Sequence, residues 1–367
     1  MSSQYRTLGI MASFHGEEPT FKEKSYYKML TLAGRRLEIR VFVFSPRMID
    51  FEEREVTGFE YHQDDWVKRK FPLPQVVYDR CFMGSVSRKR YKPLIERLQQ
   101  DDKVTFLGNG LSGKWQVYQT LSQSEELRKW LPETFLFSIQ RVNSLLVKEQ
   151  DIIVKPAAGT HGLSVIRVSK RANGEYEVTG RNHVNERFTK KFNTRTGLQR
   201  FLLTFTANRP FIIQPYLTLH TPAGTPYDVR VLVQKNGEGK WETTGKAVRM
   251  GEKHGITSNL HGGGKAVALS PFLIHYFGQK RQILIDEEIN SLISKVPVYL
   301  ESSHGRLVEL GIDIGIDTAG NVWIIEVNSR PGRTVFRQID DQTARIRSMT
   351  QPVKYAEYLM NERVGGY

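Results

Sequence analysis

Apolar runs and amphipathic stretches alternate along the first third of the chain. Strand-like runs cover Arg6–Ser13, Glu38–Phe44, Val56–Tyr61, Pro74–Cys81 and Val104–Leu107. Patterns with helical spacing cover Phe21–Arg35 and Ser87–Gln100. Such an alternation is typical of an α/β domain with a mostly parallel sheet. We therefore predict a small α/β domain over residues 1–108.

The next part of the chain is mainly helical, and strands dominate the rest. The helical pattern runs from Lys114 to Lys148 and is broken at Pro132. Strand-like runs then cover Asp151–Val168 (around a glycine-rich loop), Tyr176–Val178, Phe211–Leu217, Asp228–Gln234 and Trp241–Met250. Helical patterns return at Thr196–Phe205 and within Phe272–Lys295, and we expect the chain after residue 332 to be partly helical.

The segment Arg306–Pro331 has the pattern of two alternating strands joined by a Thr-Ala-Gly-Asn turn. If Asp317 faces Val322 across the turn, the register sets Asp313 opposite Glu326. One face of this predicted hairpin is then apolar and consists of Ile312, Ile314, Ile316, Ile325 and Val327.

The opposite face of the hairpin carries Asp313, Glu326 and Asn328. Two carboxylates paired across a hairpin, with Cβ atoms roughly 5 Å apart, repel each other unless a positive group lies between them. Two carboxylates and an amide suit a hard cation such as Mg²⁺, which keeps waters and takes further ligands from substrate phosphates. The alternative is an ordinary hairpin with a polar, solvated face.

Composition and length describe an ordinary globular protein. The 367 residues are 39% hydrophobic and 25% charged, which allows a substantial core in one large or two smaller domains. No apolar run approaches the roughly 20 residues of a membrane span, and the first residues lack the apolar core of a signal peptide. The single cysteine, Cys81, fits a reducing cytosol and follows an apolar strand, so we expect a buried structural thiol.

The net charge of +14 favours a polyanionic partner, and most of this excess falls after residue 108. Nucleotide phosphates, nucleic acid and an acidic polymer all satisfy this charge. Direct nucleic-acid binding would rest on charge alone, because the chain has no RNP, zinc or helix-turn-helix signature. The basic run Arg181–Arg200 is either a solvated face or a surface for phosphate or an acidic substrate.

Two glycine-rich segments are candidates for phosphate binding. Gly108–Trp115 matches G-x-G-x-x-G, but it closes the first α/β unit whereas that fingerprint normally opens one. It also resembles a phosphate loop, yet Trp115 replaces the hydroxyl residue that binds magnesium. A dinucleotide site remains an alternative, and we favour an interdomain linker in which Lys114 begins a helix.

The second segment follows Lys155, where residues 157–162 form a loop of small residues between two strands. Small residues let backbone N–H groups approach phosphate oxygens, and the lysine adds a point charge. An ordinary hairpin loop is the alternative, and His161 is better explained as a loop residue than as a catalyst.

Strand arginines supply further candidate chemistry. Asp228 and Arg230 share one face of their strand, and Arg249 lies within the next. A strand arginine is costly to desolvate unless it is paired or binds an anion, so Arg230 and Arg249 are candidates for phosphate or carboxylate contact. A structural ion pair with Asp228 is the alternative.

These elements, in this order, resemble the ATP-grasp superfamily over roughly residues 109–340. The fragments LGIMAS, VVYDR, LPET, DVRVLVQ and EVNSRPG resemble more narrowly the endospore coat-associated YheC/YheD family. The resemblance implies an α/β (α+β) architecture, with a pre-ATP-grasp domain at 1–108 and an ATP-grasp domain at 109–355. It divides the latter into a lid subdomain at about 140–212 and a C-terminal metal and substrate subdomain at about 213–355.

The resemblance also implies a ligand set, with ATP and Mg²⁺ as cofactors. Lys114 and Lys155 would contact the ATP phosphates, covered by the backbone of Gly159, Thr160, His161 and Gly162. The adenine would meet Gln214, Tyr216 and Leu217. Magnesium would be held by Asp313, Glu326 and Asn328. Arg249 and Asn259 would lie by the transferred phosphoryl group, and Arg230 would bind the acceptor carboxylate.

The function implied is ATP-dependent joining of a carboxylate to an amine through an acyl phosphate. The two substrates are unknown, and a peptide or an acidic polymer in spore formation is one expectation. This would place the protein in the cytoplasm, in association with the developing spore coat and its proteins, and away from membranes. The alternatives are a non-catalytic coat component with the same fold and a small-molecule kinase.

Overall fold

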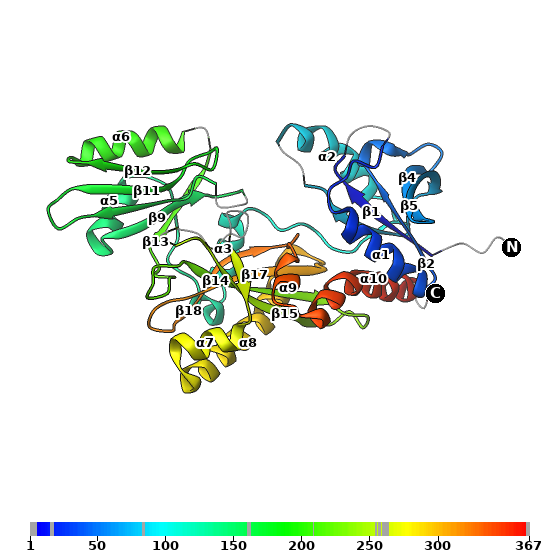
Figure 1. Cartoon of the computed structure of the whole chain (residues 1–367). Coiled ribbons are helices and arrows are strands. Elements are labelled where there is room, and N and C mark those ends of the chain that lie inside the picture. Colours follow the sequence, from blue (N-terminus) through cyan, green and yellow to red (C-terminus); the bar gives the residue numbers. More distant parts are fainter. Residues whose placement is uncertain are drawn as a thin grey trace.

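The structure is a computed structural model that describes residues 6–14, 18–82, 85–159, 163–207, 209–253, 255, 258 and 264–364, with the backbone alone for 85–88 and 363–364. The described residues form three sheets. The sheet that contains β14, β15, β17 and β18 lies between the other two (Figure 1). Within these ranges, no helix combines the length and the apolar character that crossing a membrane requires.

The N-terminal sheet has the strand order β3-β4-β2-β1-β6-β7, with β5 added to β4. Its parallel part consists of β1 (Arg6–Ala12), β2 (Ile39–Phe44), β6 (Val76–Arg80) and β7 (Thr105–Phe106). The connecting helices are α1 (Lys24–Arg36) and α2 (Ser85–Gln99). An antiparallel extension follows a short helix η1 (Pro46–Met48) and consists of β3 (Ile49–Asp50), β4 (Glu55–His62) and β5 (Asp65–Pro72). The parallel α/β arrangement confirms the predicted fold class of this part.

The second sheet, which we call the lid sheet, has the order β12-β11-β10-β9-β13-β8. Its strands are β8 (Phe135–Leu136), β9 (Asp151–Pro156), β10 (Ile166–Lys170), β11 (Tyr176–Arg181), β12 (Arg187–Phe192) and β13 (Phe211–Pro215). Helices α5 (Ile139–Lys148) and α6 (Arg195–Thr206) pack on one face, against alternate residues such as Ile152 and Val154. The strand alternation therefore turns Lys155 to the opposite face.

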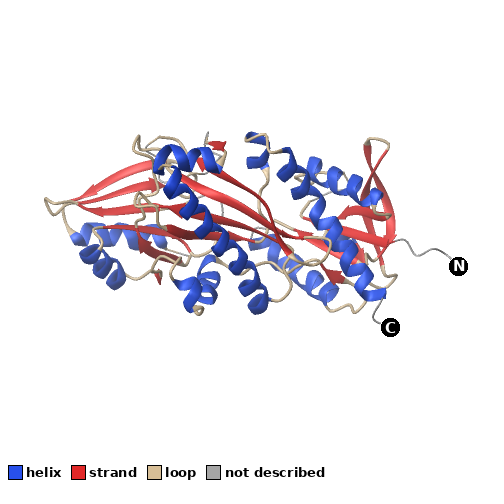
Figure 2. Cartoon of the chain, turned by 90° about the horizontal axis from the view of Figure 1, so that it is seen from below, coloured by secondary structure: helices blue, strands red, loops and turns tan. Residues whose placement is uncertain are grey.

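The third sheet, which we call the C-terminal sheet, has the order β16-β15-β14-β17-β18. Its strands are β14 (Tyr227–Lys235), β15 (Trp241–Met250), β16 (Lys265–Val267), β17 (Glu309–Ile316) and β18 (Val322–Asn328). Helices α3 (Lys114–Ser122), α4 (Glu125–Arg128), α7 (Leu269–Phe277) and α8 (Gln279–His304) contribute to the large apolar core on one face. Seen from below, helices lie in front of these strands (Figure 2).

The β17–β18 hairpin forms as predicted, but its register is different near the turn. Ile316, and not Asp317, faces Val322, while a β-bulge between Asp313 and Ile314 still brings Asp313 opposite Glu326. The predicted apolar face is wrong at Ile325, because the bulge turns this side chain toward Gly315 on the other face of β17. Ile324 takes its place in the core.

The last helices tie the C-terminal sheet to the N-terminal one. Helix α9 (Thr334–Gln338) covers β15, and α10 (Gln342–Val364) extends from β14 and β15 to α1. Tyr355, Ala356 and Leu359 of α10 complete the apolar cluster under β1 and α1. The predicted helical character of the chain after residue 332 is therefore confirmed, and α10 packs on the N-terminal core.

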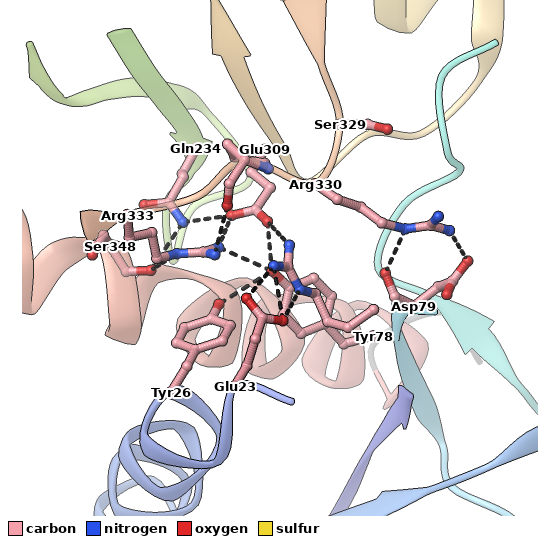
Figure 3. A network of polar contacts seen from close by, with 12 residues as sticks. Glu23, Tyr26, Tyr78, Asp79, Gln234, Glu309, Ser329, Arg330, Arg333 and Ser348 are labelled. Carbon is pink, nitrogen blue, oxygen red and sulfur yellow. Dashed lines mark hydrogen bonds and ion pairs between the residues drawn. The ribbon is translucent and has the colours of Figure 1, made fainter. Parts of the chain in front are cut away.

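A buried polar network also joins these two parts (Figure 3). Glu309 of β17 is fully buried and forms ion pairs with Arg80 of β6 and with Arg333. It also accepts hydrogen bonds from the Tyr78 hydroxyl (2.6 Å) and the Gln234 amide (2.9 Å). Burial would raise the pKa of Glu309, but the two guanidinium groups outweigh it and lower this pKa.

Replacing Glu309 by glutamine should destabilise the fold by about 3 kcal/mol, because it leaves buried guanidinium charge without its counter-ion. Urea unfolding at neutral pH measures the loss. Asp101→Asn is the matched control, since its partner Arg54 is 46% exposed, so solvent screens this pair and its loss should cost no more than about 1 kcal/mol. Equal losses in the two variants would contradict a buried, mutually dependent network.

Candidate functional site

A cleft lies between the lid sheet and the C-terminal sheet. Lys155, Ile212 and Gln214 reach it from the lid sheet, and residues 324–327 from β18. Helix α3 supplies Lys114, Val117, Tyr118 and Leu121, and the segment before β8 supplies Leu131 and Pro132. Apolar side chains with a few convergent polar groups are typical of a small-molecule site.

Lys114 connects the two walls of the cleft. It is the first residue of α3, and its Nζ donates to the Gly159 carbonyl of the lid and lies 2.8 Å from Glu326 Oε1. The Lys114 and Glu326 side chains are 18% and 23% exposed, so the pair is only partly screened by water. The predicted helix start at Lys114 is confirmed, and residues 107–113 form the linker before it.

Beside this pair, four buried residues form a chain of alternating charge across β15, β14 and β17. Arg249 donates through Nε (2.7 Å) and Nη2 (2.5 Å) to the Asp228 carboxylate. The same Nη2 lies 3.0 Å from Asp313 Oδ2. Arg230 makes the second bidentate contact with Asp313, at 2.5 and 3.1 Å. The strand register sets Asp228 opposite Arg249 and Arg230 opposite Asp313, so the four charged side chains follow one another across the three strands.

The electrostatics of this charge chain favour full ionisation. Burial would raise the pKa of Asp313, but Arg230 and Arg249 outweigh it and lower this pKa. Burial would likewise lower the pKa of Arg249, yet Asp228 and Asp313 raise it overall. The arginines are therefore fixed cations whose directions are set by two carboxylates.

Asp228 also contacts Ser258, which lies between β15 and β16 in the chain. The Ser258 hydroxyl donates to Asp228 Oδ2 at 2.5 Å, and both residues are buried. Sequence patterns indicated Asp228 only as a possible ion-pair partner of a strand arginine, and that arginine is Arg249. No local pattern indicated the contact with Ser258.

Lys155 carries the most perturbed amine of the cleft. Burial lowers the pKa of Lys155 to about 8, with Lys114 adding to the effect and Glu326 and Asp313 opposing it. A half-buried lysine between like and unlike charges gains most from a bound anion, because the anion supplies the missing counter-charge.

The other predicted site residues fall in different places. Gln214 lines the cleft and donates to Thr134 Oγ1 at 2.7 Å. Tyr216 follows β13, and the Arg167 guanidinium carbon lies over its ring, 4.0 Å from the ring centroid. Leu217 comes next in the chain. Gly159 lies in the loop after β9, whereas Thr160, His161, Gly162 and Asn259 lie outside the described residues.

The predicted magnesium ligands share one face of the hairpin. Glu326 pairs with Asp313 and Asn328 with Gly311, so all three residues lie on the same face of the hairpin, and Glu326 lines the cleft. In the described ranges, no group of three or more His, Cys, Asp or Glu side chains is arranged to hold a metal. Two carboxylates and an amide nevertheless fit a magnesium ion that retains waters and phosphate ligands.

The sequence missed most of the apolar lining of the cleft. Val117, Leu121, Ile212 and Ile324 belong to patterns that predict only a helix or strand core, and their meeting depends on how the two sheets face each other. The bulge at β18 adds Ile325 to the same wall.

Cys81 is buried, as predicted, and burial raises the pKa of its thiol.

Comparison with known proteins identifies the family of this chain. The YheC/D-like ATP-grasp family model matches residues 103–359. The endospore coat-associated protein YheC of Bacillus subtilis is 33% identical over 365 residues, which cover 97% of each chain.

Solved structures share the fold at low sequence identity. The D-cycloserine synthetase DcsG has a TM-score of 0.56 and 12% identity, over 97% of this chain and 99% of its own. A RiPP-associated ATP-grasp ligase of Chryseobacterium gregarium, solved with ADP and a leader and core peptide, has a TM-score of 0.51 and 13% identity over 97% of both chains.

If Lys155 contacts nucleotide phosphates, ATP affinity should be nearly constant below its pKa of about 8 and fall above it, by up to about tenfold per pH unit. The sign follows because bound phosphate favours the ammonium, so binding above pH 8 requires uptake of a proton. Isothermal titration between about pH 7.5 and 9.5 measures the effect.

Lys155→Arg is the matched variant, because a guanidinium stays charged throughout this range. Its ATP affinity should lack the decline. The same pH dependence in wild type and variant would rule out Lys155 as the titrating group.

Proposed function

Because the chain belongs to the YheC/D-like ATP-grasp family, we propose that it is an ATP-dependent carboxylate–amine ligase that works through an acyl-phosphate intermediate. The observation that carries this proposal is the charged end of the cleft. There, Lys114 and Lys155 stand beside the buried chain of Asp228, Arg249, Asp313 and Arg230. Such a set of directed cations is what phosphoryl transfer requires.

In this proposal the nucleotide occupies the cleft between the two sheets. The adenine lies on the apolar walls near Gln214, with the backbone after β13 at Tyr216 and Leu217 as its edge partner. Lys114 and Lys155 contact the phosphates, and the backbone N–H groups of residues 159–162 cover them. Lys114 would then exchange its contacts with Gly159 and Glu326 for phosphate oxygens.

The reaction proceeds in two displacements. A carboxylate oxygen of the acid attacks the γ-phosphorus, the bond to the β-phosphate oxygen breaks, and ADP leaves as the acyl phosphate forms. The amine then attacks the carbonyl carbon, loses a proton and expels phosphate, which leaves an amide. Arg249, with Asn259, stabilises the transferring phosphoryl group, and Arg230 orients the acceptor carboxylate.

Asp313, Glu326 and Asn328 would hold magnesium in this scheme. The ion would supply neutralisation of the β- and γ-phosphate charge. The positive partners of the two carboxylates, Arg230, Arg249 and Lys114, lie on the same side and would share the phosphate oxygens with it.

We propose a peptide or an acidic polymer as the substrate, in spore formation and in contact with coat proteins. The net charge of +14, the coat association of the Bacillus subtilis relative and the peptide bound by the Chryseobacterium gregarium ligase support this choice. The corresponding location is the cytoplasm near the developing coat.

Hydroxylamine provides the test, because it traps any acyl phosphate as a hydroxamate without knowledge of the natural amine. Incubation with ATP, magnesium and a panel of amino acids, acidic peptides and poly-glutamate should yield ADP and hydroxamate together. Glu326→Gln should lower both by at least about a hundredfold, and Asp101→Asn should leave them unchanged.

Three outcomes would contradict the proposal. ADP formation retained in Glu326→Gln would remove the role assigned to that residue. A stable phosphorylated product without hydroxamate would identify a kinase. Nucleotide binding without turnover across the panel and spore extracts would favour a non-catalytic coat component.

A further inference from the structure

The segment from Asn328 to Arg333 lies between the candidate site and the N-terminal sheet. Its first residue, Asn328, is the last residue of β18 and the amide proposed as a magnesium ligand. It then crosses β17 over Gly311, where a Cβ atom on the glycine would lie 2.6 Å from Pro331 Cβ. Gly311 stands between Asp313 and Glu309 on the same face of β17, so Pro331 separates the site from the buried network.

Arg330 fixes this segment to the N-terminal sheet. Its guanidinium donates to the Asp79 carbonyl (3.3 Å), the Cys81 carbonyl (2.8 Å) and the Asp79 carboxylate. All three acceptors belong to the carboxyl end of β6, more than 240 residues away in sequence. Figure 3 shows Arg330 and Asp79 side by side, next to the network around Glu309.

The neighbours of Arg330 are held as well. Ser329 Oγ accepts from the Leu111 backbone N–H at 2.9 Å, which joins the segment to the interdomain linker. Arg333 pairs with Glu309 and donates to the Ser348 carbonyl at 3.0 Å. The contacts that fix residues 329–333 therefore come from the N-terminal sheet, the interdomain linker, β17 and α10.

From these contacts we propose that Asp79 is a positioning residue for the site, acting through Arg330 on Asn328. The N-terminal sheet thereby sets the place of the amide oxygen relative to Asp313 and Glu326. This role rests on the proposed function, because it matters only if magnesium-bound nucleotide occupies the cleft. It assigns to the N-terminal part a contribution to the metal end of the site without any contact with the ligand.

The chemistry of Asp79 makes this role separable from local folding. Its Oδ1 accepts from the Cys81 backbone N–H at 2.8 Å, which shapes the end of β6, while Oδ2 pairs with Arg330. Asparagine retains an oxygen for the first contact and loses the charge for the second. Asp79→Asn therefore removes the ion pair and keeps the turn.

The test measures ADP affinity by isothermal titration with and without magnesium, in the full chain. The ratio of the two affinities is the magnesium coupling. Asp79→Asn and Arg330→Gln should each lower this coupling by about tenfold, as loss of an outer partner of a metal ligand does. ADP affinity without magnesium should stay unchanged, because Lys114, Lys155 and the apolar walls are untouched.

Two further variants sharpen the result. The double variant should lose no more coupling than either single one, since both remove the same contact. Arg330→Lys keeps a charge beside Asp79 but lacks the bonds to two carbonyls, so it should restore part of the coupling. Asp101→Asn is the control: its side chain is 11% exposed, against 15% for Asp79, and its arginine partner lies within the N-terminal part.

Full coupling in Asp79→Asn and Arg330→Gln would overturn this role and leave the proposed function standing. An equal loss in Asp101→Asn would also overturn it, because the effect would then follow from general destabilisation. Failure of the wild type to bind ADP at all would refute the proposed function and this role together.

Discussion

The pairing of Asp313 with Glu326 across one hairpin is the constraint around which the site is arranged. Two carboxylates on neighbouring strands require positive charge close by. Arg230 and Arg249 supply it for Asp313, and Lys114 supplies it for Glu326. Asp228 then holds Arg249 from the other side, so the positions of the cations follow from the pairing of β14, β15, β17 and β18.

The same sheet also explains how distant parts of the chain take part. Glu309 lies four residues before Asp313 on the same face of β17, and it binds the N-terminal sheet through Arg80 and Tyr78. The segment after β18 returns over Gly311 and contacts both regions. The candidate site and the interface with the N-terminal sheet are thus two halves of one sheet face, separated by Pro331.

Sequence patterns predicted the strands with clear alternation and the order of the chemical motifs. The Asp313–Glu326 pair was correct although the assumed turn register was wrong, because a bulge near Ile325 compensates for a shift at Asp317. Periodicity does not show bulges. Strands β5 and β12 were missed because they are mostly exposed and charged, so neither has the apolar alternation of a half-buried strand. Contacts such as those of Arg330 with β6 depend on tertiary packing and have no local signal.

A thermal-shift titration with ATP tests most directly the central claim, that the cleft binds a magnesium nucleotide between Lys155 and the Asp313–Glu326 pair. Wild-type protein and the Asp313→Asn/Glu326→Gln double variant are compared with and without magnesium. At 100 times its dissociation constant, a ligand stabilises the folded state by about 2.7 kcal/mol, which is easily measured. The account predicts a magnesium-dependent shift in the wild type that the double variant lacks. No shift at millimolar ATP, or the same shift in both proteins, would contradict it.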